Sequence, residues 1–144
     1  MQTIRSSDGT VIAFERSGNG PPVVLVGGAL STRAGGAPLA EKLAPHFTVI
    51  CYDRRGRGDS GDTPPYAVER EIEDLAALID AAGGSAYVFG MSSGGGLSLL
   101  AAANGHPITR LAVFESPYAV DASRPPVPSD YRTRLDTLLA EGRR

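Results

Sequence analysis

The stretch that decides the fold is Ala86-Tyr87-Val88-Phe89-Gly90-Met91-Ser92-Ser93-Gly94, an apolar run that ends in a glycine-flanked serine. It continues into Gly95-Gly96-Leu97-Ser98-Leu99-Leu100-Ala101-Ala102-Ala103, which has the composition of a helix. A G-x-S-x-G between a strand and a helix is typical of a sharp turn that raises a serine hydroxyl at the top of a parallel sheet. Small residues flank the serine because the strand and the helix approach closely there. The pattern predicts a strand over 86–89, a turn at Ser92 and a helix over 93–104.

The rest of the chain is predicted to alternate between strands and helices after an antiparallel start. Asp8-Gly9 favours a tight turn between strands at Gln2–Arg5 and Val11–Ser17. The other expected elements are strands at Val23–Val26, Thr48–Tyr52 and Arg110–Phe114, and helices at Pro38–Ala44, Ala67–Ala82 and Ser129–Glu141. This order indicates an α/β fold with a mostly parallel sheet. Because sites in such sheets lie at the carboxyl ends of the strands, loops 27–36 and 53–65 and the Ser92 turn are the candidate regions.

Composition excludes several classes of protein. The 144 residues form one domain or part of one, and a net charge of −2 gives no general attraction to nucleic acid or anionic membranes. The single cysteine, Cys51, excludes an internal disulfide and a cysteine-rich zinc site. No signal-peptide pattern and no apolar run long enough to cross a bilayer is present. We expect a cytoplasmic protein with no nucleic-acid or membrane partner and no metal or organic cofactor.

Three separated stretches resemble the α/β-hydrolase family, in the order that the family has. Gly90–Gly94 is similar to its nucleophile turn, and Asp53-Arg54-Arg55-Gly56-Arg57-Gly58-Asp59-Ser60 to its D-x-R-G-x-G-x-S loop. Val24–Ala29 lies where the family has an apolar strand followed by His-Gly, with Gly27 in place of the histidine. The resemblance covers roughly residues 1–120. It implies an α/β-hydrolase-type, mostly parallel sheet with flanking helices and an antiparallel N-terminal hairpin, incomplete in this chain.

The resemblance assigns Ser92 as a nucleophile. A serine hydroxyl needs a base to remove its proton, and attack on an acyl carbon creates an oxyanion that needs fixed hydrogen-bond donors. In this family the donors are two backbone N–H groups, which by position belong to Ala29 and Ser93. A glycine-flanked turn serine without chemistry is the alternative for Ser92.

Four further residues are expected at the site. Leu30, Met91 and Tyr118 are expected to line the substrate pocket. Glu115 directly follows the strand expected at 110–114, so it is a candidate for the catalytic acid, the alternative being a loop carboxylate that lines the pocket. The arginines of the 53–60 loop could hold a phosphate, but the slightly negative chain and the lack of interleaved aromatic residues favour a loop whose aspartates and arginines brace one another.

Neither histidine of the chain is expected to reach Ser92. His46 comes just before a strand, which puts it at the amino end of the sheet, and His106 follows about 12 helical residues, or about 18 Å. A general base must come within ~3 Å of the hydroxyl.

Because the acid and the histidine follow the serine in the family's order, we expect both in a C-terminal half that is a second polypeptide. Residues 1–124 would then be the N-terminal part of the core and 125–144 the start of a helical lid, with Arg143-Arg144 left by a trypsin-like nick.

The predicted activity is that of a serine hydrolase on a small-molecule acyl substrate. An acyl-serine intermediate would serve ester, thioester or lactone hydrolysis alike. A cofactor-free perhydrolase or haloperoxidase-like enzyme is an alternative within the same class. A non-catalytic α/β-hydrolase-like protein that binds a ligand or a partner is the alternative from another class, favoured by Gly27 and by the lack of a usable histidine.

Overall fold

The computed structural model describes residues 1–121 and 125–143, and it confirms the expected α/β fold. Within these residues the sheet has six strands in the order β1-β2-β4-β3-β5-β6. Their bounds are Gln2–Arg5, Val11–Ser17, Pro22–Val26, Thr48–Tyr52, Ala86–Met91 and Ile108–Phe114 for β1 to β6. Strands β1 and β2 pair antiparallel with each other, and β2 pairs antiparallel with β4, whereas β4, β3, β5 and β6 are parallel.

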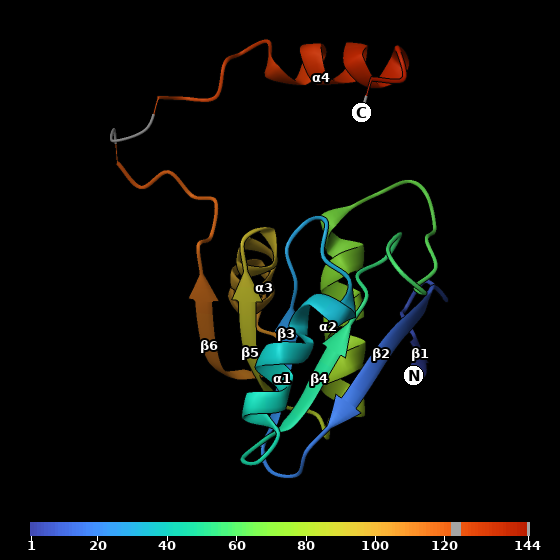
Figure 1. Cartoon of the computed structure of the whole chain (residues 1–144), viewed down its shortest axis with the longest axis vertical. Coiled ribbons are helices and arrows are strands. Elements are labelled where there is room, and N and C mark those ends of the chain that lie inside the picture. Colours follow the sequence, from blue (N-terminus) through green and yellow to red (C-terminus); the bar gives the residue numbers. More distant parts are fainter. Residues whose placement is uncertain (122–124, 144) are drawn as a thin grey trace.

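Helices cover both faces of the parallel part of the sheet (Figure 1). Helix α1 (Ala37–Leu43) packs on one face, and α2 (Val68–Ala81) and α3 (Ser93–Ala103) pack on the other. Four side chains of α2 reach the larger core, namely Ile72, Leu75, Leu78 and Ile79. The covered strands therefore end in loops that meet at one edge, where the predicted site residues lie.

The strands next to the Ser92 turn are longer than expected. Strand β5 continues to Met91, and β6 begins at Ile108, because the pairing of Met91 with Phe114 and of Ala86 with Ile108 extends the ladder at both ends. The loop over 27–36 also contains a short 3-10 turn, η1, at Arg33–Gly36. These differences leave the predicted topology unchanged.

Almost all of the described residues beyond β6 are exposed. Helix α4 (Tyr131–Ala140) has no buried residue, and its N-cap is Asp130. The expected boundary between core and lid at residue 124, and the terminal Arg144, lie outside the described residues. In the part of the chain that is described, no helix has both the length and the apolar character needed to cross a lipid bilayer.

Candidate active site

Ser92 occupies a strained turn between β5 and α3. Its backbone angles are φ 53° and ψ −124°, so a non-glycine residue lies in the left-handed region that costs of order 1–3 kcal/mol. The turn is held by hydrogen bonds from Ser92 N to Phe114 O (2.9 Å) and from Gly95 N to Ser92 O (2.9 Å). Strain at one serine, fixed by the neighbouring strand and helix, is the local geometry predicted for this stretch.

Glycines allow the first turn of α3 to contact the end of β3. A Cβ at Gly94 would overlap Val26 O and lie 2.5 Å from Gly27 O, and one at Gly90 would lie 2.6 Å from Gly94 O. Backbone atoms cannot yield as a flexible side chain can. The small residues around Ser92 are therefore required by the contact between α3 and β3.

The loop after β3 passes beside Ser92. A Cβ at Gly28 would lie 3.5 Å from Ser92 Cβ and 3.8 Å from Met91 O, so the loop that carries Ala29, the next residue, approaches Ser92. Ser93 is the first residue of α3, and no carbonyl within the helix can accept its backbone N–H. The two residues expected to supply oxyanion donors thus belong to segments that meet at Ser92.

A hollow of about 460 Å³ brings Ser92, Glu115 and Tyr118 together. Glu115 has a φ of 53° and directly follows β6, next to the strand that ends at Ser92. The Oγ of Ser116 is buried beside Gly95 and has no hydrogen-bond partner within residues 1–121 and 125–143. Two residues with positive φ, Ser92 and the carboxylate-bearing Glu115, therefore border one open space at the carboxyl edge of the sheet.

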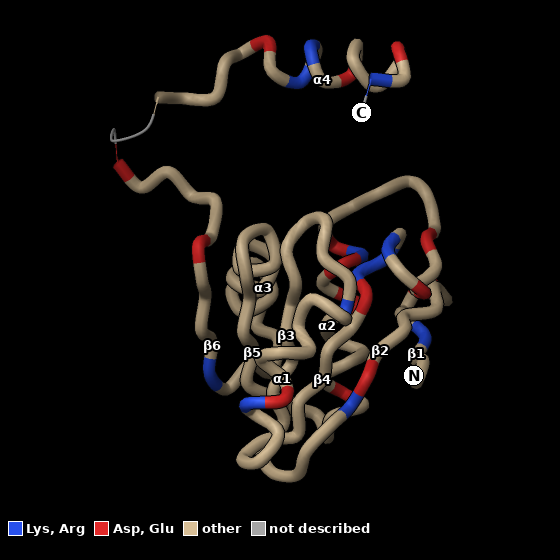
Figure 2. Tube along the Cα trace, in the orientation of Figure 1, with Lys and Arg blue, Asp and Glu red and all other residues tan. Residues whose placement is uncertain are grey.

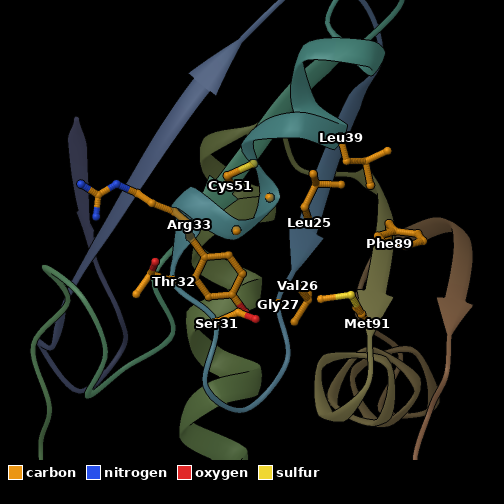
Figure 3. Close-up of a pocket in the computed structure, with 13 residues that line it drawn as sticks. Leu25, Val26, Gly27, Ser31, Thr32, Arg33, Leu39, Cys51, Phe89 and Met91 are labelled. Atoms are coloured by element: carbon orange, nitrogen blue, oxygen red, sulfur yellow. The ribbon is translucent and has the colours of Figure 1, made fainter.

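Met91 and Leu30 lie away from this hollow. Met91 lines a second cavity of about 170 Å³ with Leu25 and Phe89 on the α1 face of the sheet (Figure 3). Leu30 is 98% exposed and lines neither space. Of Leu30, Met91 and Tyr118, the structure places only Tyr118 in the hollow that contains Ser92.

Arg54 and Arg55 of the 53–60 loop are braced by helix α2, which corrects the expected pairing within the loop, whereas Arg57 donates to the carbonyls of Ala29 and Arg55. Arg54 binds Glu71 through Nε (2.6 Å) and Nη2 (2.8 Å), and Arg55 binds Asp74 through Nε (2.8 Å) and Nη2 (2.7 Å). Figure 2 shows these opposite charges together where the loop after β4 meets α2. Burial raises the pKa of Glu71, but the hydrogen bonds and positive charge of Arg54, with smaller effects from Arg57 and Tyr66, together outweigh it and hold that pKa below its usual value. Both arginines are therefore engaged by carboxylates and are not free for a phosphate.

Arg54 also contacts both segments that meet at Ser92. Its Nη1 donates to Ser93 Oγ (2.9 Å) and to Gly27 O (3.2 Å). The expectations from sequence did not include this contact or Glu71. The available signal was the pair of adjacent arginines together with Glu71 and Asp74, which are three residues apart on the apolar face of a helix.

Both histidines lie at the opposite edge of the sheet from Ser92. His46 precedes β4, and His106 lies between α3 and the start of β6. The six residues of β5 separate the two edges by about 20 Å at ~3.3 Å per residue. Among the residues that the structure describes, no group of three His, Cys, Asp or Glu side chains is placed to bind a metal ion.

Comparison with known proteins agrees with this geometry. A model of the alpha/beta hydrolase family matches residues 23–144. The chain is 34% identical over 139 residues to a pimeloyl-[acyl-carrier protein] methyl ester esterase of Xanthomonas campestris pv. campestris, a match that covers 85% of this chain and 53% of that relative.

Solved structures show the same likeness. An alpha/beta hydrolase from Sphaerobacter thermophilus is 89% identical, with a TM-score of 0.95 over 99% of this chain and 55% of that one. A thermophilic esterase from Thermogutta terrifontis is 28% identical, with a TM-score of 0.79 over 99% of this chain and 55% of that one. The chain spans about half the length of these relatives. Its fold and most of its sequence match one family, and the chain belongs to the alpha/beta hydrolase family.

Proposed function

We propose that this chain carries the nucleophile and the oxyanion hole of a serine esterase. The observation that carries the proposal is the strained turn at Ser92, with Gly28 beside its Cβ and the N-terminus of α3 beneath it. A tight turn of this kind presents a hydroxyl to substrate, and nearby backbone N–H groups stabilise the negative charge that develops during acyl transfer. Ser92 is then the nucleophile, and the N–H groups of Ser93 and Ala29 are the oxyanion donors.

The reaction proceeds through an acyl-serine. A base takes the proton of Ser92 Oγ while the oxygen attacks the acyl carbon, and the resulting oxyanion is bound by Ser93 and Ala29. Collapse of this intermediate expels the alcohol, which receives the proton. Water then attacks the acyl-serine, gives one proton to the base and releases the carboxylic acid, after which the proton returns to Ser92.

The histidine base is assigned to the C-terminal half of the same hydrolase, acting as a second polypeptide. Two observations support the C-terminal half itself: the chain spans about half of its relatives, and β6 leaves Val113 and Phe114 exposed at the edge of the sheet. An unpaired apolar edge of this kind favours addition of further strands. Glu115 lies in the hollow with Ser92 and is the candidate acid that the described residues offer.

Helix α4 is assigned to a lid over the site. Its leucines Leu135, Leu138 and Leu139 are at least one-third exposed, and residues 115–121 after β6 run away from the sheet (Figure 1). Apolar side chains on a helix are stabilised when they cover a substrate pocket or a neighbouring helix. Tyr118, which lies between β6 and α4 in the sequence, would then line the substrate space.

The proposed substrate is a small-molecule ester. Relatives named as esterases, among them one named for a methyl ester of an acyl-carrier-protein conjugate, support this class. A non-catalytic binding protein is the second candidate, and the position of both histidines at the far edge of the sheet favours it.

A serine-directed probe separates the two candidates. The chain is combined with its C-terminal half to give the assembled hydrolase, which is treated with a fluorophosphonate and assayed with p-nitrophenyl esters. We expect covalent labelling and ester turnover, both lost in Ser92→Ala. An assembled protein that neither labels nor turns over ester would leave binding as its function. Mass spectrometry of the purified protein tests the second polypeptide, because the proposal requires a companion chain beside the 15.0 kDa species.

A further inference from the structure

Arg54 joins two segments of the site through a single guanidinium nitrogen. Its Nη1 donates to Ser93 Oγ at 2.9 Å, in the first turn of α3, and to Gly27 O at 3.2 Å, at the start of the loop after β3. The same first turn of α3 already packs against this end of β3, because Gly94 approaches the carbonyl oxygens of Val26 and Gly27. Arg54 therefore bridges the contact on which the spacing of these segments depends.

The position of this nitrogen is fixed from the other side by Glu71. The carboxylate accepts from Nε and Nη2 of Arg54, and its Oε1 also accepts from Tyr66 Oη at 3.1 Å. A two-bond pair between a guanidinium and a carboxylate sets the orientation of the planar group as well as its distance. Glu71 is itself carried by α2, whose Leu75 and Leu78 are fully buried in the core.

We propose that Arg54 is a positioning residue for the oxyanion hole, a role that rests on the proposed function. The donors assigned to that hole are the N–H groups of Ser93 and Ala29, and Arg54 binds the side chain of the first and a carbonyl two residues before the second. Oxyanion donors accelerate acyl transfer only when they are held in place before the charge develops. Arg54 supplies this by tying both donor segments to helix α2.

The chain offers a matched control in the next residue. Arg54 and Glu71 are 5% and 1% exposed, and Arg55 and Asp74 are 3% and 1% exposed. Both pairs join the same loop to the same helix through two short hydrogen bonds. The further partners of Arg55 are Asp8 and the carbonyl of Arg70, which belong to neither donor segment.

Two double variants remove both members of one buried pair each, and Arg55→Met/Asp74→Leu also leaves the Asp8 carboxylate, whose side chain is 12% exposed, without its arginine. Replacing a buried ion pair by apolar residues of similar volume is often tolerated, whereas removing one partner is strongly destabilising. The variants are Arg54→Met/Glu71→Leu and Arg55→Met/Asp74→Leu, each in the assembled hydrolase. Ser93→Ala is a third, milder variant, because it keeps the backbone N–H and removes only the hydroxyl that binds Arg54.

The measurements are kcat and KM for a p-nitrophenyl ester and the affinity for a boronic acid, whose tetrahedral serine adduct resembles the charged intermediate. For Arg54→Met/Glu71→Leu we expect kcat to fall about tenfold or more and boronic-acid affinity to fall in parallel, where tenfold corresponds to about 1.4 kcal/mol. KM should stay within about twofold, because the uncharged ester does not use the oxyanion donors fully. Ser93→Ala should lower kcat about threefold, and Arg55→Met/Asp74→Leu should leave kcat within about twofold.

Each outcome decides the proposal. Equal losses of kcat in the two double variants, or an unchanged kcat and boronic-acid affinity in Arg54→Met/Glu71→Leu, would overturn it. If that double variant does not fold, as judged by circular dichroism, Ser93→Ala decides, and an unchanged kcat there overturns the role of Arg54. An unmodified protein that neither labels with fluorophosphonate nor turns over ester instead refutes the proposed function, and the role of Arg54 in catalysis is refuted with it.

Discussion

Gly94→Ala is expected to impair the proposed reaction far more than it impairs folding. The new Cβ would lie 2.5 Å from Gly27 O and closer still to Val26 O, both of which belong to the backbone at the end of β3. An ordinary contact needs at least 3.4 Å, so α3 must move away from β3 by more than about 0.9 Å at this point. The displacement falls on the residues next to Ser92.

The effects on stability partly cancel. Crowding of a packed site typically costs about 1–3 kcal/mol, while replacing a helical glycine by alanine returns up to about 1 kcal/mol. The effect on rate does not cancel, because a misplacement of about 1 Å at a reacting centre can cost about 100-fold. We therefore expect kcat to fall by about two orders of magnitude while the free energy of unfolding changes by about 1–2 kcal/mol.

Gly96→Ala is the control in the same helix. The three atoms nearest its Cβ would all belong to the Tyr118 side chain, with the hydroxyl at 3.4 Å and two ring carbons at 3.8 Å, which are ordinary contacts. Both variants are compared with the unmodified protein by ester turnover and by urea unfolding in the assembled hydrolase. Equal kcat values for Gly94→Ala and Gly96→Ala would refute the argument that contact between α3 and β3 sets the geometry of the site.

Three further predictions concern stability and reactivity. Leu75→Ala removes a fully buried side chain of α2 and should lower the free energy of unfolding, measured by urea titration, by about 2–5 kcal/mol. Leu138→Ala on the exposed helix α4 should change that free energy by less than about 0.5 kcal/mol. The pKa of Glu71 is held below its usual value, so as the pH falls through about 4.3 the unfolded chain binds more protons than the native one, and the free energy of unfolding should fall. Arg54→Met/Glu71→Leu should show a shallower dependence of that free energy on pH between pH 5 and pH 3. An equal slope in the variant and the unmodified protein would contradict the assignment. Burial, with a smaller effect from the charge of Glu15, raises the pKa of Cys51 to about 11, so its reaction with a disulfide reagent at pH 8 should be at least about 100-fold slower in the native protein than in urea.

The sequence predicted the elements whose signals are local. Strand β4 was expected over Thr48–Tyr52 and is found there, because a short apolar run can be buried on both faces without reference to its partners. The ends of β5 and β6 were missed because they depend on each other. Gly90 pairs with Val26 on one side and Val113 on the other, and Met91 pairs with Phe114, and a single stretch of sequence does not contain these pairings.

The turn at Ser92 could be predicted from a local signal, whereas the partners of Arg54 could not. The turn at Ser92 was predictable because glycine spacing records a backbone requirement within five residues. Glu71 lies 17 residues from Arg54 and Asp74 lies 19 residues from Arg55, and the apolar periodicity of α2 suggests that its charged residues face water. A carboxylate can be buried when an arginine neutralises it and fills its hydrogen bonds, and that condition is met only after the loop and the helix have come together.

This pairing accounts for a helix whose buried face is partly charged. Leu75, Leu78 and Ile79 hold α2 against the sheet, and Glu71 and Asp74 use the same anchored face to fix two consecutive residues of the loop after β4. Only the first of these arginines reaches Ser93 and Gly27. The hydrophobic core thus determines where Nη1 of Arg54 lies. That nitrogen in turn sets the spacing between the loop after β3 and the turn at Ser92, so the geometry proposed for acyl transfer depends on the packing of α2.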